Sequence, residues 1–393
     1  MSGITRRMFM ALLASSVLAT AAPAFAQQDV DEIIIGGSMP LTGVFAFAGV
    51  AIEAGIRDYV KMINEEGGIN GKPVRFIYED TGHQIDQAVA IFNKLTTQHR
   101  NIHLYYGDST GFSRTINPEL ERRGDIMLTS VSFASEINNP ETFSNQFIAG
   151  PDYSQMVSIL LEHIAKEKPG ARIVFVNSDG EFGRDPIEPS TARAKELGLE
   201  VVEQIITPPG AVDVSTEVLK LRRARPDYTI FHGYILSPLP EFMTQARQLG
   251  LETKFMGTFW SMDSSIWEDV GEHADGFMGV MPYRYYYDDA ADAPMLERIR
   301  QMRPQYQPTG YTQGFLTAML MTEAAKRALD AGKELNGANL KAALNSIQDF
   351  DTGGIIGVPI SISGNSIPVG RIYQYSASAR RMEPVSDWIS LKD

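Results

Sequence analysis

The stretch IIIGGSMPLTGVFAFAG, residues 33–49, decides the fold that we predict for this chain. It opens with three consecutive Ile residues, and such a run is typical of a strand covered on both faces, as in a parallel sheet. We expect a turn after this strand and then the start of a helix. The residues that predict the turn are Gly36, Gly37, Pro40 and Gly43.

The turn would carry hydroxyl and aromatic side chains to the carboxyl end of the strand, namely Ser38, Thr42, Phe45 and Phe47. Ligands of open α/β sheets bind at that edge. Phe45 and Phe47 are therefore candidate ligand contacts. Loop aromatics also serve as ordinary core residues, and this stretch alone leaves both interpretations open.

Strand–loop–helix units repeat beyond this stretch and predict a parallel sheet with helices on both faces. In the first half the predicted strands are 73–79, 102–106 and 126–129, and the predicted helices are 85–97 and 112–122. The pattern restarts near Gly150, with strands predicted at 172–177, 201–206, 226–231 and 254–257. Two similar α/β halves would leave a cleft between them, with both carboxyl edges facing it.

The last third of the chain departs from this alternation. A strand is predicted at 277–280, an aromatic connector at 282–289, and helices at 294–303, 309–331 and 339–346. Residues 355–362 and 367–375 are expected to form a terminal hairpin. We expect these elements to return to the first half before the tail ends on the second.

Residues 1–26 are predicted to be an export signal. Arg6 and Arg7 precede an apolar stretch of small residues, and Ala24-Phe25-Ala26 fits the A-x-A cleavage pattern. Cleavage after Ala26 would leave a mature chain that works in the periplasm. The paired arginines are also compatible with the twin-arginine export route.

The composition excludes several classes of function. The chain has no Cys, which rules out a Cys nucleophile and Cys-ligated metals. It has 35 Lys and Arg against 48 Asp and Glu, and loss of Arg6 and Arg7 with the signal would take the net charge from −13 to −15. An acidic chain without basic runs is a poor binder of nucleic acid.

The common motifs for metal binding are also missing from the sequence. The six His residues form no H-x-x-H pair, although His83 and His232 sit at predicted strand ends and could reach a cleft. The pattern G-x-S-x-G occurs once, as GDSTG at residues 107–111, and no phosphate-binding loop occurs. The acidic run at Asp179, Glu181 and Asp185 does not have the spacing of a calcium loop. We therefore expect neither an enzyme nor a metal or other cofactor.

The segment Asp108-Ser109-Thr110-Gly111 precedes a predicted helix and has two interpretations. It could be only an N-cap arrangement. It could also offer hydroxyl and free N–H groups to an anionic ligand.

Several of these pieces together resemble the extracytoplasmic solute-binding proteins of ABC importers, of the type that includes the leucine/isoleucine/valine-binding proteins. The similar pieces are GGSMPLTGVFAFAG (36–49), NEEGGINGKP (64–73), residues 107–109 and 179–183, QARQLGL (245–251) and the export signal. The resemblance covers nearly the whole mature chain.

The resemblance implies an α/β fold of two doubly wound parallel-sheet lobes, joined by three crossovers around a ligand cleft. Lobe 1 would comprise residues 27–149 plus 281–357, and lobe 2 residues 150–280 plus 358–393. It also implies one small-molecule ligand, delivery to the membrane subunits of an ABC permease, and no nucleic acid partner. We expect a monomer.

The chain departs from the amino-acid-binding members of this family at the ligand. Those members carry an acid that holds the ligand's ammonium, and the aligned position here is Phe259. A hydroxyl residue that helps to bind the amino acid aligns with Phe133, and a cleft Tyr aligns with Phe182, whereas Tyr234 still fits an aromatic position. A buried ammonium without a carboxylate would cost several kcal/mol.

We therefore expect an aromatic-walled slot for a small aromatic or other apolar carboxylate. The expected ligand-binding residues are Phe45, Phe47, Asp108, Ser109, Thr110, Ser132, Phe133, Phe182, Tyr234, Phe259 and Trp260. The alternatives that the sequence leaves open are a branched-chain amino acid or amide for import, and a periplasmic ligand-sensing module.

Overall fold

A computed structural model describes residues 32–391, except 209, 212, 235–237, 264–269 and 289–290. The predicted export signal, residues 1–26, lies outside the described residues. No helix within the described ranges is long and apolar enough to cross a membrane.

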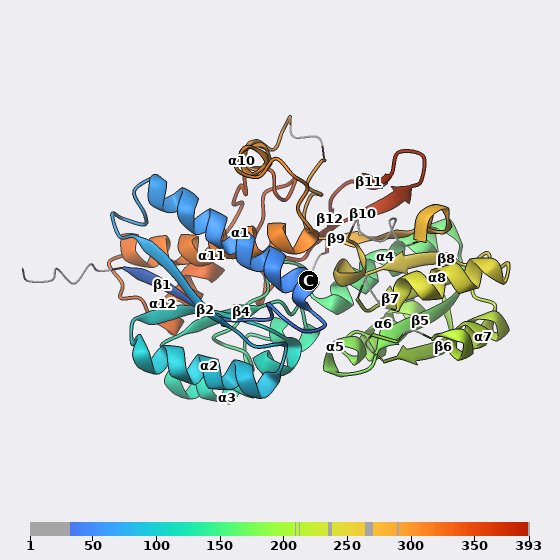
Figure 1. Cartoon of the computed structure of the whole chain (residues 1–393), viewed down its shortest axis with the longest axis horizontal. Helices are drawn as coiled ribbons and strands as arrows, with labels where there is room; N and C mark the ends of the chain where they lie inside the picture. The colour runs from blue at the N-terminus through green and yellow to red at the C-terminus, as the bar shows by residue number, and fades with distance from the viewer. Residues whose placement is uncertain are drawn as a thin grey trace, which may run out of the picture. The chain divides into compact units, whose positions relative to one another are not determined.

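The first sheet confirms the predicted alternation of strands and helices (Figure 1). Its strands are parallel and lie in the order β2-β1-β3-β4. They are β1 (Ile33–Met39), β2 (Val74–Asp80), β3 (Ile102–Gly107) and β4 (Met127–Ser130). The helices between them are α1 (Ala46–Glu65), α2 (Ile85–Gln98) and α3 (Thr110–Arg123).

Helices cover both faces of this sheet, as the isoleucine run requires. Ile34 points into a cluster that contains Phe92 of α2 and Phe112 of α3, whereas Ile33 and Ile35 belong to the larger cluster on the other face. Successive strand side chains point to opposite faces. A strand that is apolar at every position therefore has to be covered twice.

The predicted turn at Gly36 and Gly37 is wrong, because both glycines lie inside β1. A Cβ on Gly36 would lie 2.7 Å from Cδ2 of Tyr105, and one on Gly37 would lie 2.9 Å from Cε2 of Phe76. These glycines leave room for aromatic rings on the neighbouring strands. The turn itself begins at Pro40 and includes Gly43, whose φ is +83°.

The second sheet has the strand order β6-β5-β7-β8-β9-β10-β11, with β12 beside β10. Its parallel strands are β5 (Arg172–Ser178), β6 (Glu200–Thr207), β7 (Tyr228–His232), β8 (Lys254–Gly257) and β9 (Met278–Met281). Its helices are α4 (Tyr153–Glu167), α5 (Glu181–Arg184), α6 (Ile187–Glu196), α7 (Ser215–Ala224) and α8 (Leu239–Gln248). Short 3₁₀ turns are η1 (Ser135–Asn138), η2 (Phe259–Ser261) and η3 (Gly271–Ala274).

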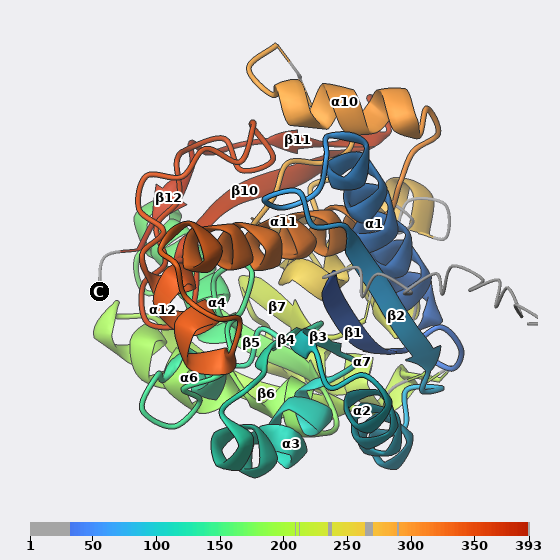
Figure 2. The same cartoon turned by 90° about the vertical axis from the view of Figure 1, so that its left-hand side faces the viewer.

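The last third of the chain packs helices on the first half and adds strands to the second sheet, as predicted. Helices α10 (Pro294–Met302), α11 (Thr309–Asp330) and α12 (Gly337–Asn345) come first, and α11 packs on α1 of the first half (Figure 2). The tail then adds β10 (Val369–Ser376), β11 (Arg381–Pro384) and β12 (Ile389–Ser390) to the second sheet. The chain thus passes between the two sheets three times: after β4, after β9 and before β10.

The predicted hairpin of 355–362 with 367–375 is wrong. The hairpin pairs β10 with β11, whereas residues 355–362 form an irregular segment that makes only an isolated bridge at Ile360. Gly353 and Gly354 before it have φ of +66° and +83°, and Pro359 inside it lacks an N–H for a strand ladder. Its isoleucines are buried although the segment forms no strand. The exact lobe boundaries stay predictions, and the one at 280/281 falls inside β9.

Helices α1 and α11 approach each other backbone to backbone at two glycines. A Cβ on Gly55 would lie 2.1 Å from the Tyr311 carbonyl oxygen, and one on Gly314 would lie 2.2 Å from that of Ile52. Only glycine allows this separation of the two helices.

We predict that Gly55→Ala lowers the free energy of unfolding by roughly 1–3 kcal/mol, because α1 and α11 must move apart to admit a methyl group. Urea denaturation followed by circular dichroism measures this. Val50→Ala, at a position on α1 that is 53% exposed, is the matched control and should change stability by less than about 0.5 kcal/mol. An equally stable Gly55→Ala protein would contradict the tight contact.

Candidate functional site

A pocket of about 440 Å³ lies where the carboxyl ends of strands from both sheets converge. The segments after β1, β2, β3 and β4 contribute to it from one sheet, and those after β5, β7 and β8 from the other. It is lined by Val44, Phe45, His83, Ile85, Ser109, Thr110, Gly111, Val131, Tyr153, Ser178, Asp179, Gly180, Glu181, Phe182, Tyr234 and Trp260. This is the edge at which open α/β sheets bind ligands.

A larger hollow of about 570 Å³ lies at the opposite, amino-terminal edge of the second sheet, around Asp227 and Lys254. Four of its charged groups already pair with each other, Lys168 with Asp227 at 2.5 Å and Lys254 with Glu167. We therefore assign the candidate site to the pocket at the carboxyl edges.

The polar wall of the pocket is the start of α3. Ser109 caps this helix, because its hydroxyl oxygen accepts a hydrogen bond from the Phe112 N–H at 3.1 Å. The same hydroxyl donates to Asp108 at 2.8 Å, and the hydroxyls of Thr110 and Ser132 lie 2.7 Å apart. Both interpretations of this segment are therefore compatible with the structure, since a capped helix start can also face a ligand with its N–H groups.

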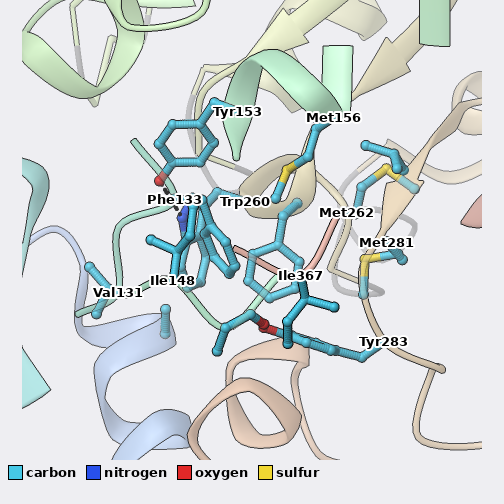
Figure 3. Packing of buried hydrophobic residues seen from close by; sticks show 14 of the residues in the cluster. Val131, Phe133, Ile148, Tyr153, Met156, Trp260, Met262, Met281, Tyr283 and Ile367 are labelled. Atoms are coloured by element: carbon cyan, nitrogen blue, oxygen red, sulfur yellow. Dashed lines mark hydrogen bonds between the residues drawn. The ribbon is translucent and has the colours of Figure 1, made fainter. Parts of the chain in front are cut away.

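The aromatic wall is a continuous set of ring contacts. Phe45 lies 5.3 Å from Tyr234 and 4.9 Å from Trp260 between ring centroids, which joins the first half of the chain to the second. Phe182 stacks on Tyr234 at 5.1 Å with planes 6° apart. The indole N–H of Trp260 donates to the Tyr153 hydroxyl at 3.1 Å (Figure 3).

His232 fixes this wall from behind. One ring nitrogen, Nε2, lies 3.0 Å from the Phe182 carbonyl oxygen, so it must carry the proton that is donated. Its other nitrogen, Nδ1, then accepts from the Thr258 hydroxyl at 2.7 Å. Burial lowers the pKa of His232 to about 3, so the ring stays neutral. Its place is structural, since it does not line the pocket.

Six of the residues expected to bind ligand line the pocket: Phe45, Ser109, Thr110, Phe182, Tyr234 and Trp260. The other five lie around it. Phe133 and Phe259 are fully buried, 5.2 Å apart, and support Trp260, beside which Figure 3 shows Phe133. Asp108 and Ser132 lie buried behind the α3 start, and Phe47 packs on Phe45 and Tyr234. Ligand contact by any of these residues stays a prediction.

The site also contains residues that the sequence analysis did not propose as ligand contacts. Tyr153 is the first residue of α4, and a capping box between Asp152 and Gln155 holds it there. Asp152 before an apolar helix is the feature of the sequence that could have predicted this helix start. His83 was noted at a strand end, and the structure places it in the pocket wall. No cluster of His, Asp and Glu that could hold a metal ion occurs among the described residues.

Comparisons with known proteins agree with this geometry. The chain belongs to the periplasmic binding protein family, whose model matches residues 32–379. It is similar to the Leu/Ile/Val-binding protein of Escherichia coli strain K12, with 26% identity over 82% of this chain and 84% of that protein. It is also similar to the leucine-specific-binding protein of Salmonella typhimurium, with 27% identity over 83% of this chain and 88% of that protein.

Solved structures confirm the two-lobe fold. A branched chain amino acid ABC transporter from Thermus thermophilus with bound valine has a TM-score of 0.81 and 22% identity, covering 92% of this chain and 96% of that chain. A fatty acid ABC transporter substrate-binding protein from Thermomonospora curvata has a TM-score of 0.79 and 18% identity, covering 92% and 93%. The chain is thus a type I periplasmic solute-binding protein of ABC importers, an exported protein from a solute-binding rather than catalytic class.

A second contact between the halves lies beside the pocket. Asp185, which follows α5, accepts from the N–H of Ser135 at 2.9 Å and from its hydroxyl at 2.7 Å. Ser135 follows the first sheet and begins η1. Burial raises the pKa of Asp185 to about 6, and the nearby Asp152 adds to the rise while Arg114 opposes it.

We predict that Asp185→Asn removes part of the pH dependence of stability. The Asp185 carboxyl has a pKa of about 6 in the folded state, against its usual value of 3.8, so the folded protein binds this proton more tightly than the unfolded chain does. The stability linked to this proton is therefore full below about pH 4 and is lost as the pH rises through about 6. The variant should have the higher Tm at pH 7.5, and the gap should close by pH 4.

Differential scanning fluorimetry from pH 4 to pH 8 measures this gap. Glu188→Gln, an exposed position on α6, is the control and should give a curve parallel to the wild type. Parallel curves for Asp185→Asn would show that Asp185 ionises at its ordinary pH.

Proposed function

We propose that the protein captures a small aromatic or other apolar carboxylate in the periplasm and delivers it to an ABC permease. The observation that carries this proposal is the division of the pocket into a hydroxyl-bearing helix start and an aromatic wall. The α3 start offers the Thr110 hydroxyl and the positive end of a helix to an anion. The rings of Phe45, Phe182, Tyr234 and Trp260 offer stacking surface to an apolar body.

The acids of the pocket support this ligand class over one with an ammonium group. The lining acids, Asp179 and Glu181, are about half exposed, with side-chain exposures of 50% and 51%. Asp179 pairs with Arg184, and Glu181 lies 3.6 Å from Arg114. Asp108 is buried behind the wall and already accepts hydrogen bonds from Thr81 and Ser109. An ammonium at the aromatic wall would therefore lack a free buried carboxylate among the lining residues.

A branched-chain amino acid is the second candidate ligand, because the curated relatives named above are leucine- or Leu/Ile/Val-binding proteins. Calorimetry on protein stripped of ligand by unfolding and refolding decides between the two. We expect benzoate-, phenylacetate- or cinnamate-like acids to bind, and leucine and valine not to bind. Micromolar binding of leucine with no response to the aromatic acids would replace the first candidate with the second.

We predict that Tyr234→Ala weakens binding of the acid by roughly 5- to 100-fold, because it removes the ring that stacks on Phe182 and bounds the pocket. Tyr234→Phe keeps the ring and is the matched control, expected to remain within about threefold of the wild type. Isothermal titration calorimetry measures all three proteins. Equal affinities for Tyr234→Ala and the wild type would remove Tyr234 from the site.

A further inference from the structure

His83 has a backbone conformation that few non-glycine residues adopt. Its φ is +60°, in the left-handed region, where a non-glycine residue has an unfavourable contact between Cβ and backbone. Within the described ranges only four other non-glycine residues, Asn70, Arg225, Asp349 and Arg380, share this region, and none of them lines the pocket. Strained residues persist where the surrounding structure fixes them, and they gather at functional sites.

Hydrogen bonds on both sides fix the turn that holds His83. Asp80 accepts from the N–H groups of Leu41 and Gly82 at 2.9 and 3.0 Å, so it ties the turn to the segment after β1. The Thr81 hydroxyl oxygen accepts from the His83 N–H at 3.0 Å, and its proton goes to Asp108 at 2.7 Å. The turn is therefore joined to the residue that precedes the α3 start.

The imidazole of His83 lies where the aromatic wall meets the polar wall, with Phe45 on one side and Asp108 nearby. Its ring stacks on Phe45, with centroids 5.2 Å apart and planes 19° apart. Burial lowers the pKa of His83, and the nearby Asp108 only partly opposes the fall, so the ring is neutral at pH 7. A neutral imidazole has one donor nitrogen and one acceptor nitrogen.

The two ring nitrogens differ in their surroundings. Nδ1 is buried and has no hydrogen-bond partner among the described residues. A buried N–H without a partner is rarer than an unpaired acceptor, which favours the tautomer with the proton on Nε2. Since His83 lines the pocket, Nε2 is the donor that remains for a ligand.

We propose that His83 is a specificity-determining ligand contact, whose Nε2–H donates a hydrogen bond to the carboxylate that the α3 start receives. This inference rests on the proposed function for the identity of that carboxylate. The strained turn holds the imidazole beside Phe45 before the ligand binds. The left-handed backbone at His83 lowers the stability of the fold slightly, and in return the hydrogen-bond donor is already in position. Binding strength and fold stability should therefore change in opposite directions when His83 is replaced.

Two variants separate these effects. His83→Gly removes both the backbone strain and the donor, and His83→Asn tolerates the left-handed conformation with a shorter side chain. We expect both variants to bind cinnamate at least tenfold more weakly than the wild type, and to melt at the same temperature or higher. The loss for cinnamide (the neutral amide of cinnamate) should be smaller, because a hydrogen bond to a charged acceptor is stronger. Calorimetry and scanning fluorimetry give the two readouts.

Arg380→Gly is the matched control, because Arg380 has φ +53° in the exposed turn between β10 and β11. It should gain stability without any change in cinnamate affinity. If His83→Asn binds cinnamate as tightly as the wild type, the inference is overturned and the proposed function stands. If the wild type binds leucine instead of cinnamate, the proposed function fails. The same variants are then titrated with leucine, and unchanged affinity overturns the inference.

Discussion

Parallel strand pairing is the constraint on which the rest of this structure depends. Because parallel strands all end at one edge of a sheet, seven separate segments of the chain deliver side chains to one place. The hydroxyls of the α3 start and the ring of Phe45 come from one sheet, whereas Phe182, Tyr234 and Trp260 come from the other. Neither half alone contains both walls of the pocket.

Much of this arrangement could be predicted from sequence, because the signals are local. The isoleucine run predicts the strand β1 by itself, and Tyr234 and Trp260 lie within three residues of the ends of β7 and β8. The family resemblance supplied the pairing of the halves. Gly36 and Gly37 are predicted in a turn but lie inside β1. The reason for glycine at these positions is not local, because they make room for Phe76 and Tyr105 on other strands.

The remaining differences have the same physical origin. Phe133 and Phe259 follow strands as Trp260 does, but they turn into the core behind it, and only packing decides which ring faces the pocket. Residues 355–362 are as apolar as a strand, yet the left-handed glycines before them and Pro359 within them prevent a ladder. Burial without regular structure leaves no periodic signal in a sequence.

The return of the tail to the second sheet has a consequence for folding. Strand β10 covers the edge of β9, yet nearly ninety residues separate the two strands along the chain, and α11 completes the first half only in between. Contacts so distant in sequence close large loops and form slowly. A nascent chain that lacks its last segment would expose the β9 edge, which is a template for association with other chains. The second sheet thus becomes complete only after the helices of the first half have been made.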